Sequence, residues 1–311
     1  MAQLKDFRCP MQPYPGLETY ARRFDLPRTR VKLFAFVAGE PKPLTILLLH
    51  GLGDEADSWR HLIVPLSTYG QVVAPDLPGF GRSEKPRRNY TIRFLLDAIL
   101  ELVELLNVSS ALIVGNSLGA TIAQILALEQ PAWLKGVVLI DGALVNQAQR
   151  INPTLLLFML PGLGEWLYNR LRKDPQAAFE TLRPYYRDLD SLSAEEQQFL
   201  FLRVNQRVWD DDQRYAYLST LRNLAPFVTR QQKGLPERLS NLDLPTLILW
   251  GEDDQILPAS NGKAAAAAQP SARFVTLAAA CHLPQQECPQ AVLQVILDDE
   301  RFQLRHRSME E

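Results

Sequence analysis

The chain contains few cysteines, and their spacing argues against two common uses of that residue. Only Cys9, Cys281 and Cys288 are present, and no two of them form a C-x-x-C pair. An odd number of cysteines without that spacing favours neither a disulfide framework nor a zinc site. We therefore expect reduced thiols, no bound metal and a cytoplasmic protein, because that compartment keeps thiols reduced.

Long apolar runs and a strong charge of either sign are also lacking. The longest apolar stretch, residues 154–167, is interrupted by proline, glycine and glutamate, and it is too short to cross a bilayer. Residues 1–16 contain no apolar core of a secretory signal. The formal net charge of -2 is not the basic footprint of a nucleic-acid-binding protein. We expect no membrane span and no nucleic-acid partner, and the oligomeric state is left open.

Short apolar runs do occur, and they alternate with helix-length segments. Runs typical of buried strands occupy residues 44–50, 71–76, 111–116, 136–141 and 245–251. The segments between several of them place apolar side chains at helical spacing. This alternation predicts a mostly parallel sheet with helices on both faces, in which ligands bind at the carboxyl ends of the strands.

The alternation stops after residue 145 and resumes at residue 236. Residues 146–235 are helical in character and rich in aromatic residues, and we interpret them as an α-helical cap inserted into one core formed by residues 1–145 and 236–311. Most of these aromatics would be explained as the insertion's own core, but some of them would line a mainly apolar substrate site. The candidates for substrate contact are Phe158, Trp166, Tyr185, Tyr186 and Trp209 in this segment, together with Asn116 outside it.

One serine stands between two glycines, where a predicted strand is followed by a predicted helix. Ser117 lies in the G-x-S-x-G stretch of residues 115–119, whose small residues allow a sharp strand-to-helix turn. Such a turn exposes the hydroxyl at a helix N-terminus, where unpaired N–H groups favour negative charge. Ser117 is therefore the candidate nucleophile, although five residues alone are equally typical of a plain glycine-rich turn.

A serine nucleophile needs a general base, and the chain has four histidines. His306 lies in a charged tail, His61 begins an apolar helical segment, and His50 precedes the serine by two elements. His282 follows an apolar run and falls in a loop at the expected end of the sheet. It is the best candidate for the base.

The base needs an acid to orient it, and one loop offers three. Glu252, Asp253 and Asp254 follow the run that ends at residue 251, and their position alone does not choose among them. Asp141, at the end of another run, is the fallback acid. Two of the three loop acids are expected to be solvated.

Hydrolysis through a serine also needs N–H donors for the developing oxyanion. The amide of Leu118, directly after the nucleophile, is one candidate. The amide of Leu52 is the other, because Gly51 and Gly53 allow a tight turn around it.

Taken together, these stretches resemble the α/β-hydrolase superfamily, in the subgroup with a helical cap. The resemblance runs from about Leu44 to Leu297 outside the cap. It rests on ordered motifs, H-G-L-G, D-x-x-G-x-G-x-S, G-N-S-L-G, G-E-D-D-x-x-x-P and C-H-x-P-x-x-E-x-P. By this resemblance the acid is Asp254 and the base is His282. Cys281 replaces the usual glycine before that histidine, and we expect it to be a buried, inert thiol.

The resemblance implies a carboxylesterase-like serine hydrolase that cleaves an ester or related acyl bond of a small molecule without a cofactor. A serine nucleophile points away from the family's haloalkane dehalogenases and epoxide hydrolases. Asn116 beside the serine suggests an alternative, carbon–carbon bond hydrolysis of the meta-cleavage-product type, although the G-G-G-P oxyanion loop of that subgroup is absent. A receptor-like member of the fold that binds a ligand and keeps the triad is a further alternative.

Overall fold

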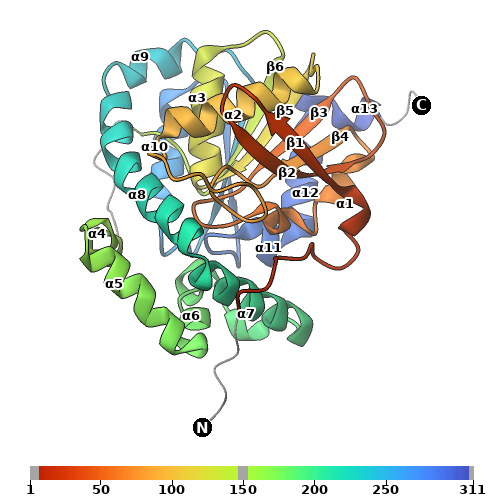
Figure 1. The fold of residues 1–311 in the computed structure, drawn as a ribbon. Helices are drawn as coiled ribbons and strands as arrows, with labels where there is room; N and C mark the ends of the chain where they lie inside the picture. The colour runs from red at the N-terminus through yellow and green to blue at the C-terminus, as the bar shows by residue number, and fades with distance from the viewer. Residues whose placement is uncertain (1–6, 146–152, 308–311) are drawn as a thin grey trace.

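The computed structural model describes residues 7–145 and 153–307, and an eight-stranded sheet forms the centre of this part of the chain (Figure 1). The strand order is β1-β2-β4-β3-β5-β6-β7-β8. The six strands from β4 to β8 in this order run parallel, whereas β1 pairs antiparallel with β2, and β2 pairs antiparallel with β4. The strands are β1 (Ala21–Leu26), β2 (Val31–Ala38), β3 (Thr45–Leu49), β4 (Gln71–Pro75), β5 (Ala111–Asn116), β6 (Leu134–Ile140), β7 (Thr246–Gly251) and β8 (Ala272–Leu277).

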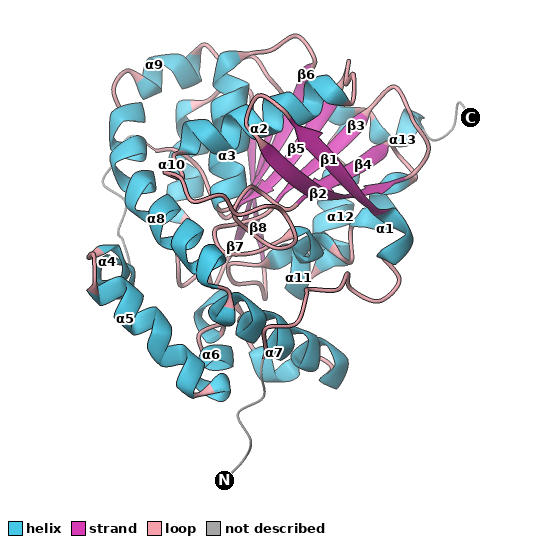
Figure 2. Ribbon diagram, in the orientation of Figure 1, coloured by secondary structure: helices cyan, strands magenta, loops and turns pink. Residues whose placement is uncertain are grey.

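Helices cover both faces of the sheet (Figure 2). Side chains of α2, α3, α9 and α10 pack in the core on one face, and side chains of α1 and α12 pack in the core on the other. The predicted mostly parallel sheet between two helical layers is therefore confirmed. The helices outside residues 146–231 are α1 (Ile63–Ser67), α2 (Ile92–Leu105), α3 (Leu118–Glu129), α9 (Leu235–Ser240), α10 (Ser260–Ala268), α11 (Pro284–Glu287), α12 (Pro289–Leu297) and α13 (Leu304–Arg307).

The strand β5 shows why the central strands are apolar throughout. All of its residues are buried. Ile113 packs in the core beside α3, whereas Leu112 and Val114 pack in the core beside α12. A strand with helices on both faces has no solvent side, so it carries an unbroken apolar run rather than an alternating one.

Residues 153–231, which we call the cap segment, are helical and lie at one end of the sheet (Figure 1). They contact the loops that follow β3, β4 and β8, which lie at the carboxyl ends of those strands. Residues 146–152, the predicted start of the insertion, lie outside the described residues. The helices of the cap segment are α4 (Pro153–Met159), α5 (Leu163–Arg170), α6 (Pro175–Glu180), α7 (Ala194–Trp209) and α8 (Asp211–Gln231).

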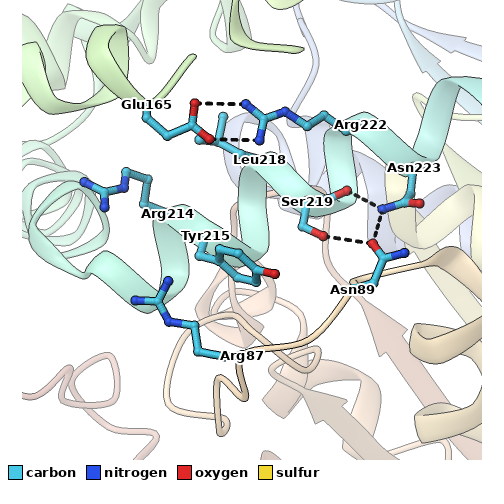
Figure 3. A pocket seen from close by; sticks show the side chains of 9 residues that line it. All are labelled: Arg87, Asn89, Glu165, Arg214, Tyr215, Leu218, Ser219, Arg222 and Asn223. Carbon is cyan, nitrogen blue, oxygen red and sulfur yellow. Dashed lines mark hydrogen bonds and ion pairs between the residues drawn. The ribbon is translucent and has the colours of Figure 1, made fainter. Parts of the chain in front are cut away.

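Arg222 joins the outer hairpin of the cap segment, α4 and α5, to α8. Its guanidinium pairs with Glu165 at 2.8 Å and donates to the carbonyl of Met159 at 3.0 Å. Figure 3 shows this pair at the edge of a groove of about 330 Å³, which is lined mainly by α8 and by residues of the segment 87–89. None of the residues proposed from the sequence for catalysis lines this groove. Within the described residues, no helix is both long enough and apolar enough to span a bilayer.

Candidate active site

Ser117 lies at the sharp turn between β5 and α3. Its backbone is in a strained conformation with φ 53° and ψ -110°. The glycines on either side make this turn possible, because a Cβ on Gly119 would lie 2.1 Å from the carbonyl oxygen of Leu49, and one on Gly115 would lie 2.3 Å from the carbonyl oxygen of Gly119. The local geometry is that of a nucleophile elbow.

Two backbone N–H groups near Ser117 are without an acceptor. The amides of Leu118, at the N-terminus of α3, and of Leu52 make no hydrogen bond to the described residues. Leu118 is only 2% exposed, so its N–H is an unpaired buried donor, which is rare in folded proteins. The loop that carries Leu52 lies close to the serine, since a Cβ on Gly51 would be 3.4 Å from the Cβ of Ser117. These donors could stabilise an oxyanion formed at the serine.

His282 and Asp254 form a buried pair. The distance between His282 Nδ1 and Asp254 Oδ2 is 2.8 Å, and the two side chains are 3% and 0% exposed. The other carboxylate oxygen of Asp254 accepts from the amides of Ile256 and Leu257 at 2.8 and 2.9 Å. These bonds hold the carboxylate as an acceptor, so His282 Nδ1 donates to it and Nε2 is available to accept a proton.

The other two acids of the same loop point elsewhere. Asp253 is exposed and pairs with Arg187 at 3.1 Å, and Glu252 is exposed. The hydroxyl of Ser117 makes no hydrogen bond to any described residue, and the residue is half-buried. Catalytic hydrogen bonds in unliganded sites are often long, so the serine and the histidine are expected to approach when substrate binds.

Asp141, the fallback acid, is a second buried carboxyl beside the pair. It is fully buried at the end of β6, and its Oδ1 accepts from the amide of Gly251 at 2.8 Å. Burial and the neighbouring charge of Asp254 raise the pKa of Asp141 well above its usual range. Asp141 therefore holds its proton to a higher pH than an exposed aspartate does. Asp254, and not Asp141, is the acid that contacts His282.

Replacing Asp141 by asparagine should preserve activity and change how stability depends on pH. The amide oxygen can still accept from the amide of Gly251, and the side chain remains uncharged beside Asp254. In the native protein, Asp141 remains protonated above pH 4 whereas the unfolded chain ionises there, so stability falls as pH rises, by up to about 1.4 kcal/mol per pH unit. The variant lacks this loss. Urea unfolding at pH 5 and pH 8 measures the free energy of unfolding of both proteins. The value for the variant relative to the native protein should be higher at pH 8 than at pH 5. An equal difference at both pH values would contradict the raised pKa of Asp141.

The cap segment anchors the loop that follows β3. Arg207 on α7 pairs with Asp54 at 2.5 Å and with Glu55 at 2.7 Å. Arg203, one turn earlier, approaches the other oxygen of Glu55 at 3.1 Å. All of these side chains are at most 14% exposed. Since Asp54 is two residues from Leu52, these ion pairs hold one of the two candidate oxyanion donors in place.

Cys281 is buried directly before the histidine. Its Sγ lies 3.2 Å from the carbonyl oxygen of Asp253 and 3.3 Å from that of Pro184. Burial raises the pKa of this thiol to about 11. The thiol is therefore uncharged near neutral pH, and an uncharged thiol is a poor nucleophile.

Asn116 connects the end of β6 to the loop that carries His282. Its amide nitrogen donates to the carbonyl oxygen of His282 at 3.1 Å and to that of Ile140 at 3.3 Å. The side chain is 1% exposed. This placement accounts for an asparagine beside the serine without any contact to substrate.

The aromatic candidates of the cap segment are placed differently from one another. The ring of Tyr185 meets the ring of His282 edge-on, with centroids 5.7 Å apart. Tyr186 is buried and its hydroxyl donates to Gln286 at 2.7 Å. Phe158 and Trp209 pack against a buried cluster of Tyr168, Ala178 and Val208, and Trp166 is 53% exposed. Only Tyr185 among them contacts a residue of the proposed triad.

Sequence reasoning missed two residues that contact the site. Tyr217 on α8 lies over Gly53, where an added Cβ would be 2.9 Å from its ring. Arg207 on α7 pairs with Asp54 and Glu55 in the loop after β3. No local pattern distinguishes either residue from the other aromatic and basic residues of an amphipathic helix.

The chain belongs to the α/β-hydrolase fold family, because the model of that family matches residues 45–289. The predicted superfamily and fold class are thereby confirmed, and the chain is a hydrolase of the α/β fold.

Curated relatives and solved structures agree with this assignment. The chain is 29% identical over 261 residues to the uncharacterized hydrolase YugF of Bacillus subtilis, covering 83% of this chain and 90% of that one. It is 25% identical over 268 residues to a 2-hydroxy-6-oxononadienedioate/2-hydroxy-6-oxononatrienedioate hydrolase of Paraburkholderia phymatum, covering 82% and 86%. The structure of 2-hydroxy-6-oxo-6-phenylhexa-2,4-dienoate hydrolase from Rhodococcus sp. strain RHA1 superposes with a TM-score of 0.73 at 25% identity, covering 91% and 98%.

Proposed function

We propose that the protein is a serine hydrolase that cleaves a carboxylic ester, or a related acyl bond, of a small and mainly apolar molecule. The observation that carries the proposal is the elbow itself. A strained serine stands beside an unpaired buried N–H, and the buried His282–Asp254 pair comes from the loops that follow β8 and β7. The chain order of serine, aspartate and histidine is the order used on this fold.

The proposed reaction proceeds through an acyl-enzyme. Ser117 Oγ attacks the carbonyl carbon while its proton passes to His282 Nε2, and the amides of Leu52 and Leu118 donate to the oxyanion. Collapse of the tetrahedral intermediate breaks the bond to the leaving alcohol, which takes the proton from Nε2. Water then repeats the sequence and releases the acid. Asp254 keeps the imidazole oriented throughout.

Carbon–carbon bond hydrolysis is the second candidate, because two relatives carry names of that activity. The structure gives it less support than the sequence did. Asn116, the residue that suggested it, donates to the backbone at the end of β6 and in the loop of His282. At the oxyanion loop, Leu52 and Asp54 stand where the G-G-G-P pattern has glycine and proline.

A substrate panel separates these functions. We expect turnover of p-nitrophenyl esters, with a maximum rate at one acyl length, and no bleaching of a coloured dienoate ring-fission product. Turnover of the dienoate alone would support the carbon–carbon reaction. No turnover of either class, together with a ligand-induced rise in melting temperature, would favour the receptor-like alternative.

A further inference from the structure

We propose that the hydroxyls of Tyr185 and Tyr217 form a polar subsite in the cap segment that hydrogen-bonds a second oxygen of the substrate, a carbonyl or carboxylate oxygen apart from the scissile carbonyl. The inference rests on the proposed function and narrows its substrate class. It predicts an ester whose acyl or alcohol part carries a hydrogen-bond acceptor, rather than a purely hydrocarbon chain.

Tyr217 occupies the oxyanion side of the site. Its ring lies over Gly53, with two ring carbons 2.9 and 3.1 Å from where a Cβ of that glycine would be. Gly53 is the neighbour of Leu52, whose amide is a proposed oxyanion donor. The ring also packs against the ring of Tyr168, with centroids 5.7 Å apart. Tyr217 therefore lies over Gly53, next to Leu52, whose amide would bind the scissile oxygen.

Tyr185 occupies the opposite, histidine side. Its carbonyl oxygen accepts from the amide of His282 at 3.1 Å, and its ring stands edge-on to the imidazole at 5.7 Å. Tyr185 thus borders the site at His282, and Tyr217 borders it at the loop after β3.

Both hydroxyls lack a partner in the protein. Within the described residues, neither Tyr185 nor Tyr217 donates or accepts a side-chain hydrogen bond, although both are half-buried. The more deeply buried tyrosines are satisfied, with hydroxyl partners at 2.9 Å for Tyr90, 2.7 Å for Tyr186 and 3.5 Å for Tyr168. When a substrate displaces the water around such a hydroxyl, leaving it unpaired is unfavourable by about 1–3 kcal/mol, so the hydroxyl favours a substrate that supplies an acceptor.

The protonation state of the pair suits donation. Burial raises the pKa of both tyrosines above the usual value, and the pKa of Tyr217 well above it. Both are therefore neutral O–H donors across the range in which His282 can act as a base. A neutral donor pair accepts ketone, ester or carboxylate oxygens, and the apolar rings around it provide the rest of the contact area.

Phenylalanine variants test the subsite because they remove only the oxygen. The substrates are p-nitrophenyl hexanoate and its analogues with a ketone at carbon 3, 4 or 5. We expect the native protein to prefer one keto ester by about tenfold in kcat/KM, and Tyr185→Phe and Tyr217→Phe each to reduce that preference by about fivefold, mainly through KM. The loss on the plain ester should be smaller than the loss on the preferred keto ester. Tyr215→Phe, an exposed tyrosine on the same helix, is the matched control and should change neither rate.

Three results would overturn the subsite: no preference for any keto ester in the native protein, a preference that survives both variants, or equal losses on plain and keto esters. Failure of the proposed function would look different, because the native protein would then cleave none of the esters. In that case thermal shifts with hexanoate and the keto hexanoates decide the subsite alone. The keto acids should stabilise the native protein more than hexanoate does, and the double phenylalanine variant should lose that difference.

Discussion

Ser117→Ala should fold like the native protein and lose ester hydrolysis by on the order of 10⁴- to 10⁶-fold. The alanine retains the small side chain that the elbow accommodates but has no oxygen to form the acyl-enzyme. Serine and alanine both have a Cβ, so the substitution does not increase the strain of the backbone at φ 53°. The measurement is kcat/KM on the best ester of the panel, with unfolding in urea as the check on folding.

Ser67→Ala is the matched control for this variant. The hydroxyl of Ser67 lies at an exposed position at the end of α1 and donates to the carbonyl oxygen of Val64 at 2.7 Å. The control should keep native activity. If Ser117→Ala retained more than about a hundredth of the native rate, a serine acyl-enzyme at this position would be contradicted.

Arg207→Met should destabilise the protein by about 3–5 kcal/mol, because it leaves the buried carboxylates of Asp54 and Glu55 without their main partner. In the variant that folds, the fall in kcat should be larger than the rise in KM. The reason is that the ion pairs of Arg207 no longer hold the loop that carries Leu52. Arg207 acts through that loop, so it is a positioning residue. Urea unfolding and ester kinetics measure the two effects separately.

Arg87→Met provides the comparison. Arg87 also forms an ion pair at 2.8 Å, with Asp212, but the two side chains are 59% and 52% exposed. Exposed pairs contribute about 0–1 kcal/mol, so this variant should be close to native in stability and rate. Adding Glu55→Gln to Arg207→Met should recover part of the lost stability, because a neutral amide is less unfavourable to bury than an unpaired carboxylate. Similar losses for both arginine variants would contradict the anchoring role.

The elements and the candidate triad could be expected from sequence because each depends on local signals. The apolar runs that became β3 to β7 are buried on both faces, which removes the ambiguity of alternating patterns. Ser117, Asp254 and His282 each stand in a short motif directly after a strand. The choice of Asp254 over Asp253 came from the family motif, and the structure places Asp254 within 2.8 Å of the imidazole.

The polar contacts of the cap segment could not be predicted in the same way. Arg207 and Glu55 are separated by 152 positions in the chain, and neither lies in a motif. Trp166 and Tyr217 are both aromatic residues on helices, yet one is 53% exposed and the other covers the loop after β3. The helical period defines which side chains share a face, but the docking of that face depends on contacts between distant segments. The antiparallel strands β1 and β2 were missed because the resemblance begins only at Leu44.

The most direct test of the account is to treat the native protein with a fluorophosphonate and to locate the adduct by peptide mass spectrometry. The account predicts one stoichiometric adduct, located on Ser117. An absence of any adduct, or an adduct on a different residue, would contradict the claim that Ser117 is the nucleophile.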